Sequence, residues 1–267
     1  MLVDSHCHLQ DPKFKRDMLD VIASARAAGV TAMMTIGYDM PSSRRAIEIA
    51  DEHEDVYAAI GVHPHDARHV TQRDLDELER MADNAKVVAI GEIGLDYFRD
   101  LSPRDVQERV FRDQLELARN LKLPVVIHSR DADDESYAIL AEYEHQALPG
   151  WPRDRPLGVM HCYAGDLPLA LRYINMGFVI SIAATVTYPA AERTRAVAGG
   201  IPLRWMAVET DAPYLPPQSI RGQRNEPARV RDVAEYVAKL RGEDAGHVCD
   251  ETALTTARLF GLGDIGG

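Results

Sequence analysis

The chain has 267 residues, of which 46% are hydrophobic and 27% are charged, and its formal net charge at pH 7 is −12. This composition is typical of a globular protein, and since no apolar run reaches about 18 residues, no membrane-spanning helix is expected. The acidity weighs against a broad nucleic-acid-binding surface, but it leaves open a phosphodiester substrate held at a metal centre.

The first residues and the cysteines indicate in which cellular compartment the protein is expected. The chain enters an apolar β-prone segment at once, without the basic and apolar segments of a signal peptide. Its three cysteines, Cys7, Cys162 and Cys249, are an odd number and widely spaced, which favours free thiols. We expect a cytoplasmic protein, and a monomer or weak oligomer.

Short apolar segments alternate eight times with helical patterns up to residue 211. They are rich in Val, Ile, Met or Ala and are bounded by Gly, Pro or polar residues, as strands usually are. The predicted strands are Leu2–Ser5, Ala32–Ile36, Tyr57–Gly61, Val87–Gly91, Val125–Ile127, Leu157–Met160, Phe178–Ile182 and Met206–Glu209.

The intervening and final segments show helical spacing. The pattern predicts a helix over Phe14–Ala28, which Gly29 ends, and a longer one over Pro103–Leu121 with Ser102 as its N-cap. After the last strand comes a long proline-containing loop, Asp211–Glu226, of a length that is uncommon unless the loop is functional. Two closing helices are then predicted, at Val230–Leu240 and Glu251–Phe260.

Strands that alternate with helices predict a parallel sheet of the α/β class. Eight such units in this length favour one domain over residues 1–267, a (β/α)8 TIM barrel with closing C-terminal helices. The alternative is an open doubly wound sheet, which would require a glycine-rich turn after the first strand. That position holds Ser5-His6-Cys7-His8 instead.

Candidate ligands stand where the predicted strands end, which is where barrel enzymes carry their reactive groups. Side chains alternate along a strand, so two histidines separated by one residue share a face. A histidine or carboxylate stands at six of the eight ends: His6 and His8, His63, Glu92, His128, His161 and Asp211.

Each of these residues also has an ordinary interpretation. A single histidine such as His128 or His161 is more often a hydrogen-bonded core residue, and Glu92 or Asp211 alone fits a turn. His63 and His65 fit an ordinary loop, the interpretation we prefer for His65. Their joint occurrence at matching strand ends favours a shared site.

Four histidines and two carboxylates exceed the three protein ligands of a simple catalytic zinc centre and suit two cations about 4 Å apart. We predict that His6, His8 and Asp211 hold one cation, that His128 and His161 hold the other, and that Glu92 bridges them. The mixed nitrogen and oxygen set fits Zn or Mn more readily than Mg. Asp211, beside the activated water, is the candidate general base.

Seven motifs in order resemble the TatD family of metal-dependent deoxyribonucleases, a branch of the amidohydrolase-like barrels. They are Asp4-Ser5-His6-Cys7-His8, Gly61-Val62-His63-Pro64-His65, Gly91-Glu92-Ile93-Gly94-Leu95-Asp96-Tyr97, Ile127-His128-Ser129-Arg130-Asp131-Ala132, His161-Cys162-Tyr163-Ala164-Gly165, Glu209-Thr210-Asp211-Ala212-Pro213-Tyr214 and Arg224-Asn225-Glu226-Pro227. The sequence departs mildly from the family pattern, with Tyr163-Ala164 where Phe-Ser is frequent and Gln223 where Lys is frequent.

The resemblance implies a hydrolase with two divalent cations that cleaves DNA, often as a 3′→5′ exonuclease on single strands. It implies the same six ligands and adds His63 as a catalytic residue that positions phosphate or water. Arg224 would bind a phosphate oxygen, unless it is an ordinary loop arginine. Glu209 would support a ligand histidine. Tyr163 or Tyr214 would stack on a base or, in the interpretation we prefer, pack at the barrel mouth.

Two other functions remain open at this point. The same metal-activated water would serve a hydrolase of another bond, such as an amide, a lactone, a small phosphoester or an aminoacyl ester on tRNA. A metal-binding scaffold without turnover is disfavoured, because every proposed ligand and the base are present. For a nuclease that binds strand ends, we expect a shallow salt dependence.

Overall fold

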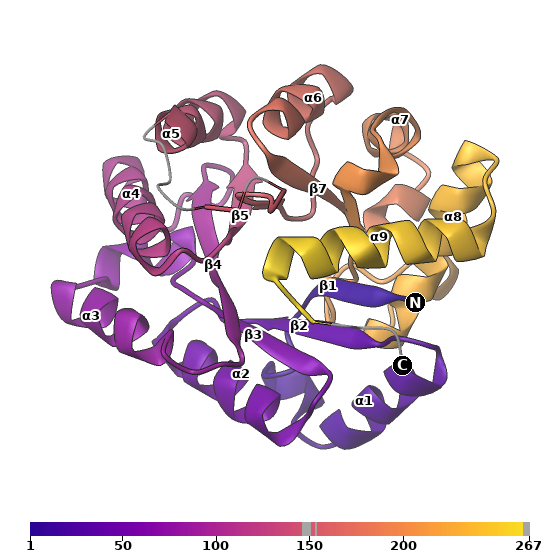
Figure 1. Cartoon of the computed structure of the whole chain (residues 1–267), viewed down its shortest axis with the longest axis horizontal. Helices are drawn as coiled ribbons and strands as arrows, with labels where there is room; N and C mark the ends of the chain where they lie inside the picture. Colours follow the sequence, from indigo (N-terminus) through magenta and orange to yellow (C-terminus); the bar gives the residue numbers. More distant parts are fainter. Residues whose placement is uncertain (146–150, 153, 264–267) are drawn as a thin grey trace.

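The computed structural model describes residues 1–145, 151–152 and 154–263. Eight parallel strands follow one another around a barrel in chain order, with helices outside them (Figure 1). The strands are β1 (Val3–Cys7), β2 (Ala32–Ile36), β3 (Val56–Ile60), β4 (Val87–Asp96), β5 (Val125–Arg130), β6 (Gly158–Met160), β7 (Phe178–Ile182) and β8 (Met206–Val208). The predicted TIM barrel is confirmed, and the open sheet is excluded.

The helices largely follow the predicted pattern. They are α1 (Met18–Ala27), α2 (Met40–Glu52), α3 (Gln72–Met81), α4 (Arg104–Leu121), α5 (Asp133–His145), α6 (Leu167–Asn175), α7 (Glu192–Gly200), α8 (Val230–Arg241) and α9 (Ala245–Phe260). Both closing helices are confirmed, although α9 begins six residues earlier than predicted, where the Asp244 side chain accepts the His247 N–H. None of the described helices is long and apolar enough to span a membrane.

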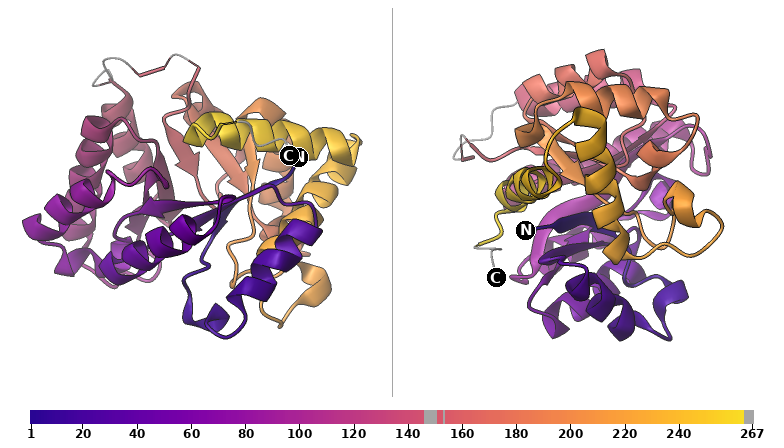
Figure 2. Two further views of the ribbon diagram at one scale, coloured as in Figure 1. Left: turned by 60° about the horizontal axis from the view of Figure 1, so that its bottom comes forward. Right: turned by 90° about the vertical axis from the view of Figure 1, so that its right-hand side faces the viewer.

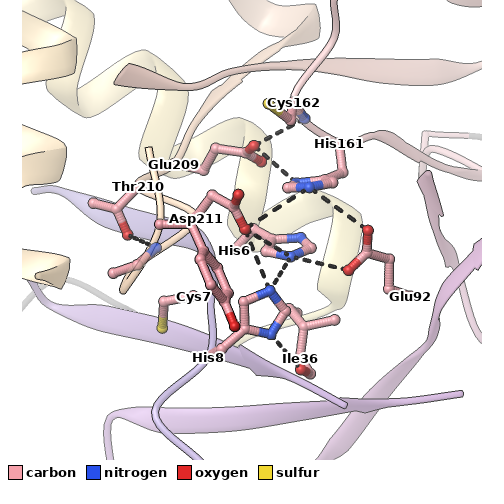
Figure 3. A network of polar contacts seen from close by, with 12 residues as sticks. His6, Cys7, His8, Ile36, Glu92, His161, Cys162, Glu209, Thr210 and Asp211 are labelled. Atoms are coloured by element: carbon pink, nitrogen blue, oxygen red, sulfur yellow. Dashed lines mark hydrogen bonds and ion pairs between the residues drawn. The ribbon is translucent and has the colours of Figure 1, made fainter. Parts of the chain in front are cut away.

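Hydrogen bonds between the ends of β1 and β8 close the barrel next to the predicted ligands. The Asp211 N–H donates to the His6 carbonyl at 2.9 Å, and the His8 N–H donates to the Ala212 carbonyl at 2.7 Å. The first motif, with His6 and His8, and the motif with Asp211 therefore lie side by side (Figure 3).

Two strands, β4 and β5, extend at least three residues beyond their predicted ends, and both carry site residues. β4 continues to Asp96 and β5 to Arg130, because the two strands pair in parallel from Ile93 and Ile127 to those ends. Glu92 and His128 therefore lie within paired strands and not in the loops after them. Backbone hydrogen bonding fixes their positions more firmly than a loop would.

Two local predictions are wrong. The helix over Phe14–Ala28 is split into a 3-10 turn at Pro12–Phe14 and α1, because Asp17 has a non-helical backbone (φ −141°). Ser102 is not the N-cap of α4, a position that Pro103 occupies. Its hydroxyl instead donates to the His65 carbonyl at 2.8 Å, which ties the start of α4 to the loop after β3.

One end of the barrel is sealed by apolar residues. Ala253, Leu259 and Phe260 of α9 belong to one buried cluster with strand residues such as Val3 and Ala207. Figure 1 shows α9 crossing the barrel at the end where the N-terminus is labelled, and Figure 2 shows the same crossing from two other sides. The opposite end, where the strands terminate, is left for the polar side chains.

Candidate metal centre

A cavity of about 470 Å³ opens where the strands end. All six predicted ligands come together there, although His6 lies beneath the surface of the cavity with 1% of its area exposed. Five of them line the cavity: His8, Glu92, His128, His161 and Asp211. Side chains that are up to 205 residues apart in the chain thus share one space (Figure 3).

The first group of predicted ligands comes from the closure of the barrel. The Nε2 atoms of His6 and His8 lie 3.2 Å apart. Oδ1 of Asp211 lies 3.3 Å from Nε2 of His8 and 3.8 Å from Nε2 of His6. Three potential donor atoms therefore face one point, as a cation requires.

Glu92 stands between this group and the remaining histidines. Its Oε2 atom lies 3.6 Å from Nε2 of His6. Its Oε1 atom lies 2.9 Å from Nδ1 of His128 and 3.7 Å from Nε2 of His161. One carboxylate oxygen faces each group, which is the arrangement that a bridging ligand needs.

The ring nitrogens on the far side of three histidines are held by oxygen atoms. Nδ1 of His8 lies 2.8 Å from the Ile36 carbonyl, Nδ1 of His161 lies 2.8 Å from Oε1 of Glu209, and Nε2 of His128 lies 3.2 Å from Oδ2 of Asp96. Hydrogen bonds of this kind fix the ring and the tautomer of His8 and His128, so the opposite nitrogen presents its lone pair to a metal, and the ion-pair contact with Glu209 orients the His161 ring. Glu209 thus contacts the ring of His161, one of the predicted ligands.

The pKa values show a cluster of strongly coupled charges. Burial alone raises the pKa of Glu92, but the charge of His161 and the hydrogen bonds from His128 and His6 hold it well below its ordinary value. Burial alone lowers the pKa of His161, yet the carboxylates of Glu209 and Glu92 raise it to about 10. Protons on the rings thus balance the buried carboxylates, and a divalent cation can take their place.

The donor set fits a divalent transition metal. Four imidazoles and two carboxylates converge in a buried space, and His6 Nδ1 has no hydrogen-bond partner in the described part of the chain. Nitrogen with oxygen ligands suits Zn or Mn. The residues therefore fit the cations expected from the sequence, whose number and identity stay predictions.

His63 lies beside the ligand group. Its Nδ1 atom accepts the His65 backbone N–H at 3.2 Å, and its Nε2 atom lies 3.6 Å from Oε1 of Glu92. Burial and the neighbouring His128 hold the pKa of His63 well below its ordinary value, so the ring is neutral. Because Nδ1 accepts a hydrogen bond, the proton is on Nε2, which becomes a donor facing the cavity.

His65 and Asp96 belong to the site, although the sequence argument assigned neither of them to it. His65 was expected to be an ordinary loop residue, but it lines the cavity with its Nε2 atom 2.9 Å from Oδ2 of Asp96. A signal for Asp96 was available, since it lies four residues after Glu92 in one strand and therefore on the same face. The sequence offered no comparable signal for His65.

Arg224 is not brought into the cavity. Its guanidinium donates to both carboxylate oxygens of Asp17, to Glu226 and to the Lys13 carbonyl. The group thus ties the loop after β8 to the segment before α1, and the structure gives no support to a contact with phosphate. The interpretation as an ordinary loop arginine fits better, although the side chain is partly buried.

The two tyrosines differ in position. Tyr163 is buried, and its hydroxyl donates to the Asp166 carbonyl at 2.9 Å, so it packs in the barrel wall. Tyr214 lines the cavity with 40% of its area exposed. All three cysteines are free, and the Cys7 thiol donates to the Met34 carbonyl, away from the ligand nitrogens.

Known proteins match this chain over nearly its whole length. The family model "TatD related DNase" matches residues 3–261. The uncharacterized metal-dependent hydrolase YabD of Bacillus subtilis is 39% identical over 260 residues, which cover 97% of this chain and 99% of that protein. The 3'-5' ssDNA/RNA exonuclease TatD of a Rahnella species is 38% identical over 264 residues, 96% of each chain.

Solved structures agree with the sequence matches. The crystal structure of YJJV, a TatD homologue from Escherichia coli K12, superposes with a TM-score of 0.90 and 32% identity over 98% of each chain. The fold, the full-length matches and the described motifs all indicate the same family. The chain belongs to the family of TatD-related DNases.

Proposed function

We propose that this metal-dependent hydrolase is a deoxyribonuclease that removes nucleotides from the 3′ end of single-stranded DNA with the help of two divalent cations. The observation that carries the proposal is the convergence of four imidazoles and two carboxylates on one cavity, with the far nitrogens of three rings held in place. The name of the Rahnella relative, a 3'-5' ssDNA/RNA exonuclease, supports the substrate class.

We assign the ligands to two halves as the sequence suggested, although the ring of His161 lies nearer to that of His6 than to that of His128. His6, His8 and Asp211 would hold one cation, His128 and His161 the other, and Glu92 would bridge them. When bound, such cations lower the pKa of water toward about 7 and polarise phosphoryl oxygens. The protein's part is to hold the ligands at fixed positions before substrate arrives, which two barrel strands and the β1–β8 closure do.

Asp211 is the proposed general base. Burial alone raises its pKa, but the nearby His8 and His161 rings lower it, so the carboxylate is ionised at neutral pH. It lines the cavity and can accept the proton of the attacking water. The neutral His63 would donate its Nε2 proton as a hydrogen bond to a phosphate oxygen.

The rim of the cavity supplies positive charge in a protein that is acidic overall. Arg99 and Arg130 line it, and neither forms an ion pair with any residue in the described ranges. Guanidinium groups match phosphate oxygens in geometry. This local positive charge makes an anionic substrate compatible with the net charge of −12, because the protein has to hold only the end of the DNA strand.

The test compares chain ends and bond types. The metal-loaded protein is incubated with single-stranded DNA labelled at the 5′ end, with duplex DNA, with RNA and with lactone, amide and small phosphoester substrates. We expect a ladder of 5′-labelled fragments that shorten one nucleotide at a time, and a loss of at least about a hundredfold in Asp211→Ala. Cleavage confined to a substrate other than nucleic acid would overturn the proposal.

Two controls keep the result interpretable. Equal DNA cleavage by Asp211→Ala would show that a contaminant is responsible. Metal-loaded protein that is inactive on every substrate would instead favour a scaffold without turnover. Faster cleavage of RNA than of DNA would show that the enzyme prefers substrates with a 2′-hydroxyl group, and it would overturn the assignment as a deoxyribonuclease.

A further inference from the structure

A second cavity, of about 420 Å³, lies at the other end of the barrel. The loops that precede β6, β7 and β8 form it together with the last turns of α9. We call it the arginine–tryptophan cavity after the residues that matter for its chemistry: Trp151, Arg155, Arg204, Trp205 and Arg258. The metal centre uses the opposite ends of the strands, so none of these residues takes part in it.

The arginine–tryptophan cavity has positive charge without matching negative charge. None of its three arginines forms an ion pair within residues 1–145, 151–152 and 154–263. Burial lowers the pKa of Arg155 and of Arg258, although both remain fully protonated near neutral pH. Among the described residues the lining holds one carboxylate, that of Asp154, which is exposed and whose charge acts on Arg258 without forming an ion pair with it. Partly buried cations are usually paired, so this group is electrostatically prepared for an anion.

Two of the three guanidinium groups, those of Arg155 and Arg258, are also held in place before any ligand arrives. Nε of Arg155 donates to the Leu259 carbonyl at 3.0 Å, and Nη2 of Arg258 donates to the Arg204 carbonyl. The Cζ atoms of Arg155 and Arg258 lie 5.3 Å and 5.4 Å from the ring centres of Trp151 and Trp205.

These contacts clamp the end of α9, but they leave most of the donors unused. A guanidinium has five N–H donors, and a single hydrogen bond to a carbonyl uses one of them. Nε of Arg258 is buried and has no hydrogen-bond partner in the described chain. A clamp for the helix end would not require three unpaired cations around one cavity.

We propose that the arginine–tryptophan cavity binds a phosphate monoester of mononucleotide size, with its phosphate against the three guanidiniums. The volume lies within the range of about 300–1,000 Å³ that small-molecule sites occupy. The indole rings, with Leu157, offer apolar surface for a flat aromatic base. This inference does not depend on the proposed nuclease activity, since it concerns residues outside the metal centre.

Tryptophan fluorescence reports this cavity alone, because the chain has only two tryptophans and both line it. We would titrate the full-length protein, with chelator present, using AMP, inorganic phosphate and adenosine as probes. The expected result is a saturable change with AMP, a weaker affinity for inorganic phosphate and no saturable change with adenosine. Saturation by adenosine as readily as by AMP, or no saturable response to AMP up to about 10 mM, would overturn the proposal.

Arg204→Gln is the variant of choice, because the Arg204 side chain is exposed and its loss should leave folding intact. It should weaken AMP binding by about tenfold or more, the effect of removing a hydrogen bond to a charged group. The matched control is Arg73→Gln, which removes the same charge from the exposed surface of α3. The thermal unfolding midpoints of both variants would confirm that each is folded. Equal AMP affinity in the folded Arg204→Gln and Arg73→Gln variants would refute the assignment.

Discussion

Nε2 of His128 lies 3.2 Å from Oδ2 of Asp96, while Nδ1 of the same ring lies 2.9 Å from Oε1 of Glu92. The ring is therefore fixed from both sides. Burial alone raises the pKa of Asp96, but its hydrogen bonds with His128 and His65 hold the pKa far below the ordinary value. An ionised Asp96 keeps the proton of the neutral ring on Nε2, so that Nδ1 is free to bind a cation.

Asp96→Asn should weaken binding of one cation by about 10- to 100-fold, because the charge that orients His128 is lost while the shape is kept. Isothermal titration of the metal-free protein with Zn²⁺ or Mn²⁺ measures this directly. Asp100→Asn is a suitable control, since Asp100 is an exposed residue that pairs with Arg104. If the two variants bound metal equally well, the orienting role of Asp96 would be excluded.

Metal content should separate the two halves of the site. We expect about two equivalents in the unchanged protein and loss of one equivalent in His128→Ala or His161→Ala. Glu92→Ala should lose both, because its two oxygens face the two groups of histidines. Elemental analysis after dialysis measures the content, and two equivalents retained in Glu92→Ala would rule out a bridging role.

Metal affinity should increase with pH. Carboxylates raise the pKa of His161 to about 10, so near neutral pH its ring carries a proton that a cation must displace. Raising the pH removes this competitor and should strengthen binding, by at most about tenfold per pH unit for each proton released. Competition with a chromophoric chelator at pH 6, 7 and 8 tests this prediction. Glu209→Gln should flatten the dependence, and an affinity independent of pH would contradict the prediction.

We predict that Phe98 stacks on a base of the substrate, because it is exposed and contacts Arg130, which lines the cavity. Its side chain is 57% exposed in the loop after β4, and the Cζ atom of Arg130 lies 3.9 Å from its ring centre. Phe98→Ala should raise KM for single-stranded DNA about tenfold and leave kcat nearly unchanged, because a stacked base contributes about 1–3 kcal/mol to binding. Leu101→Ala, at an exposed residue of the same loop, is the control. A fall in kcat with unchanged KM would argue against stacking.

The sequence by itself determined the framework of this protein. Eight apolar segments separated by helical patterns predicted the barrel, because local periodicity follows from whether a segment is a strand or a helix. In a parallel barrel every strand delivers its last residues to the same end. The histidines and carboxylates at strand ends were therefore expected to meet, and the structure brings all six together, with five lining one cavity and His6 buried beneath it.

Only the tertiary structure decided how the remaining side chains are used. His65 faces Asp96, although an ordinary loop residue was expected, and Arg224 binds Asp17, a choice that the sequence had left open. The arginine–tryptophan cavity is lined by residues from segments that are distant in the sequence, and no sequence motif predicted it. The partner of a loop side chain depends on which residues the folded barrel places beside it. Strand periodicity is local and can be read in the sequence, whereas contacts between loops exist only after the chain has closed.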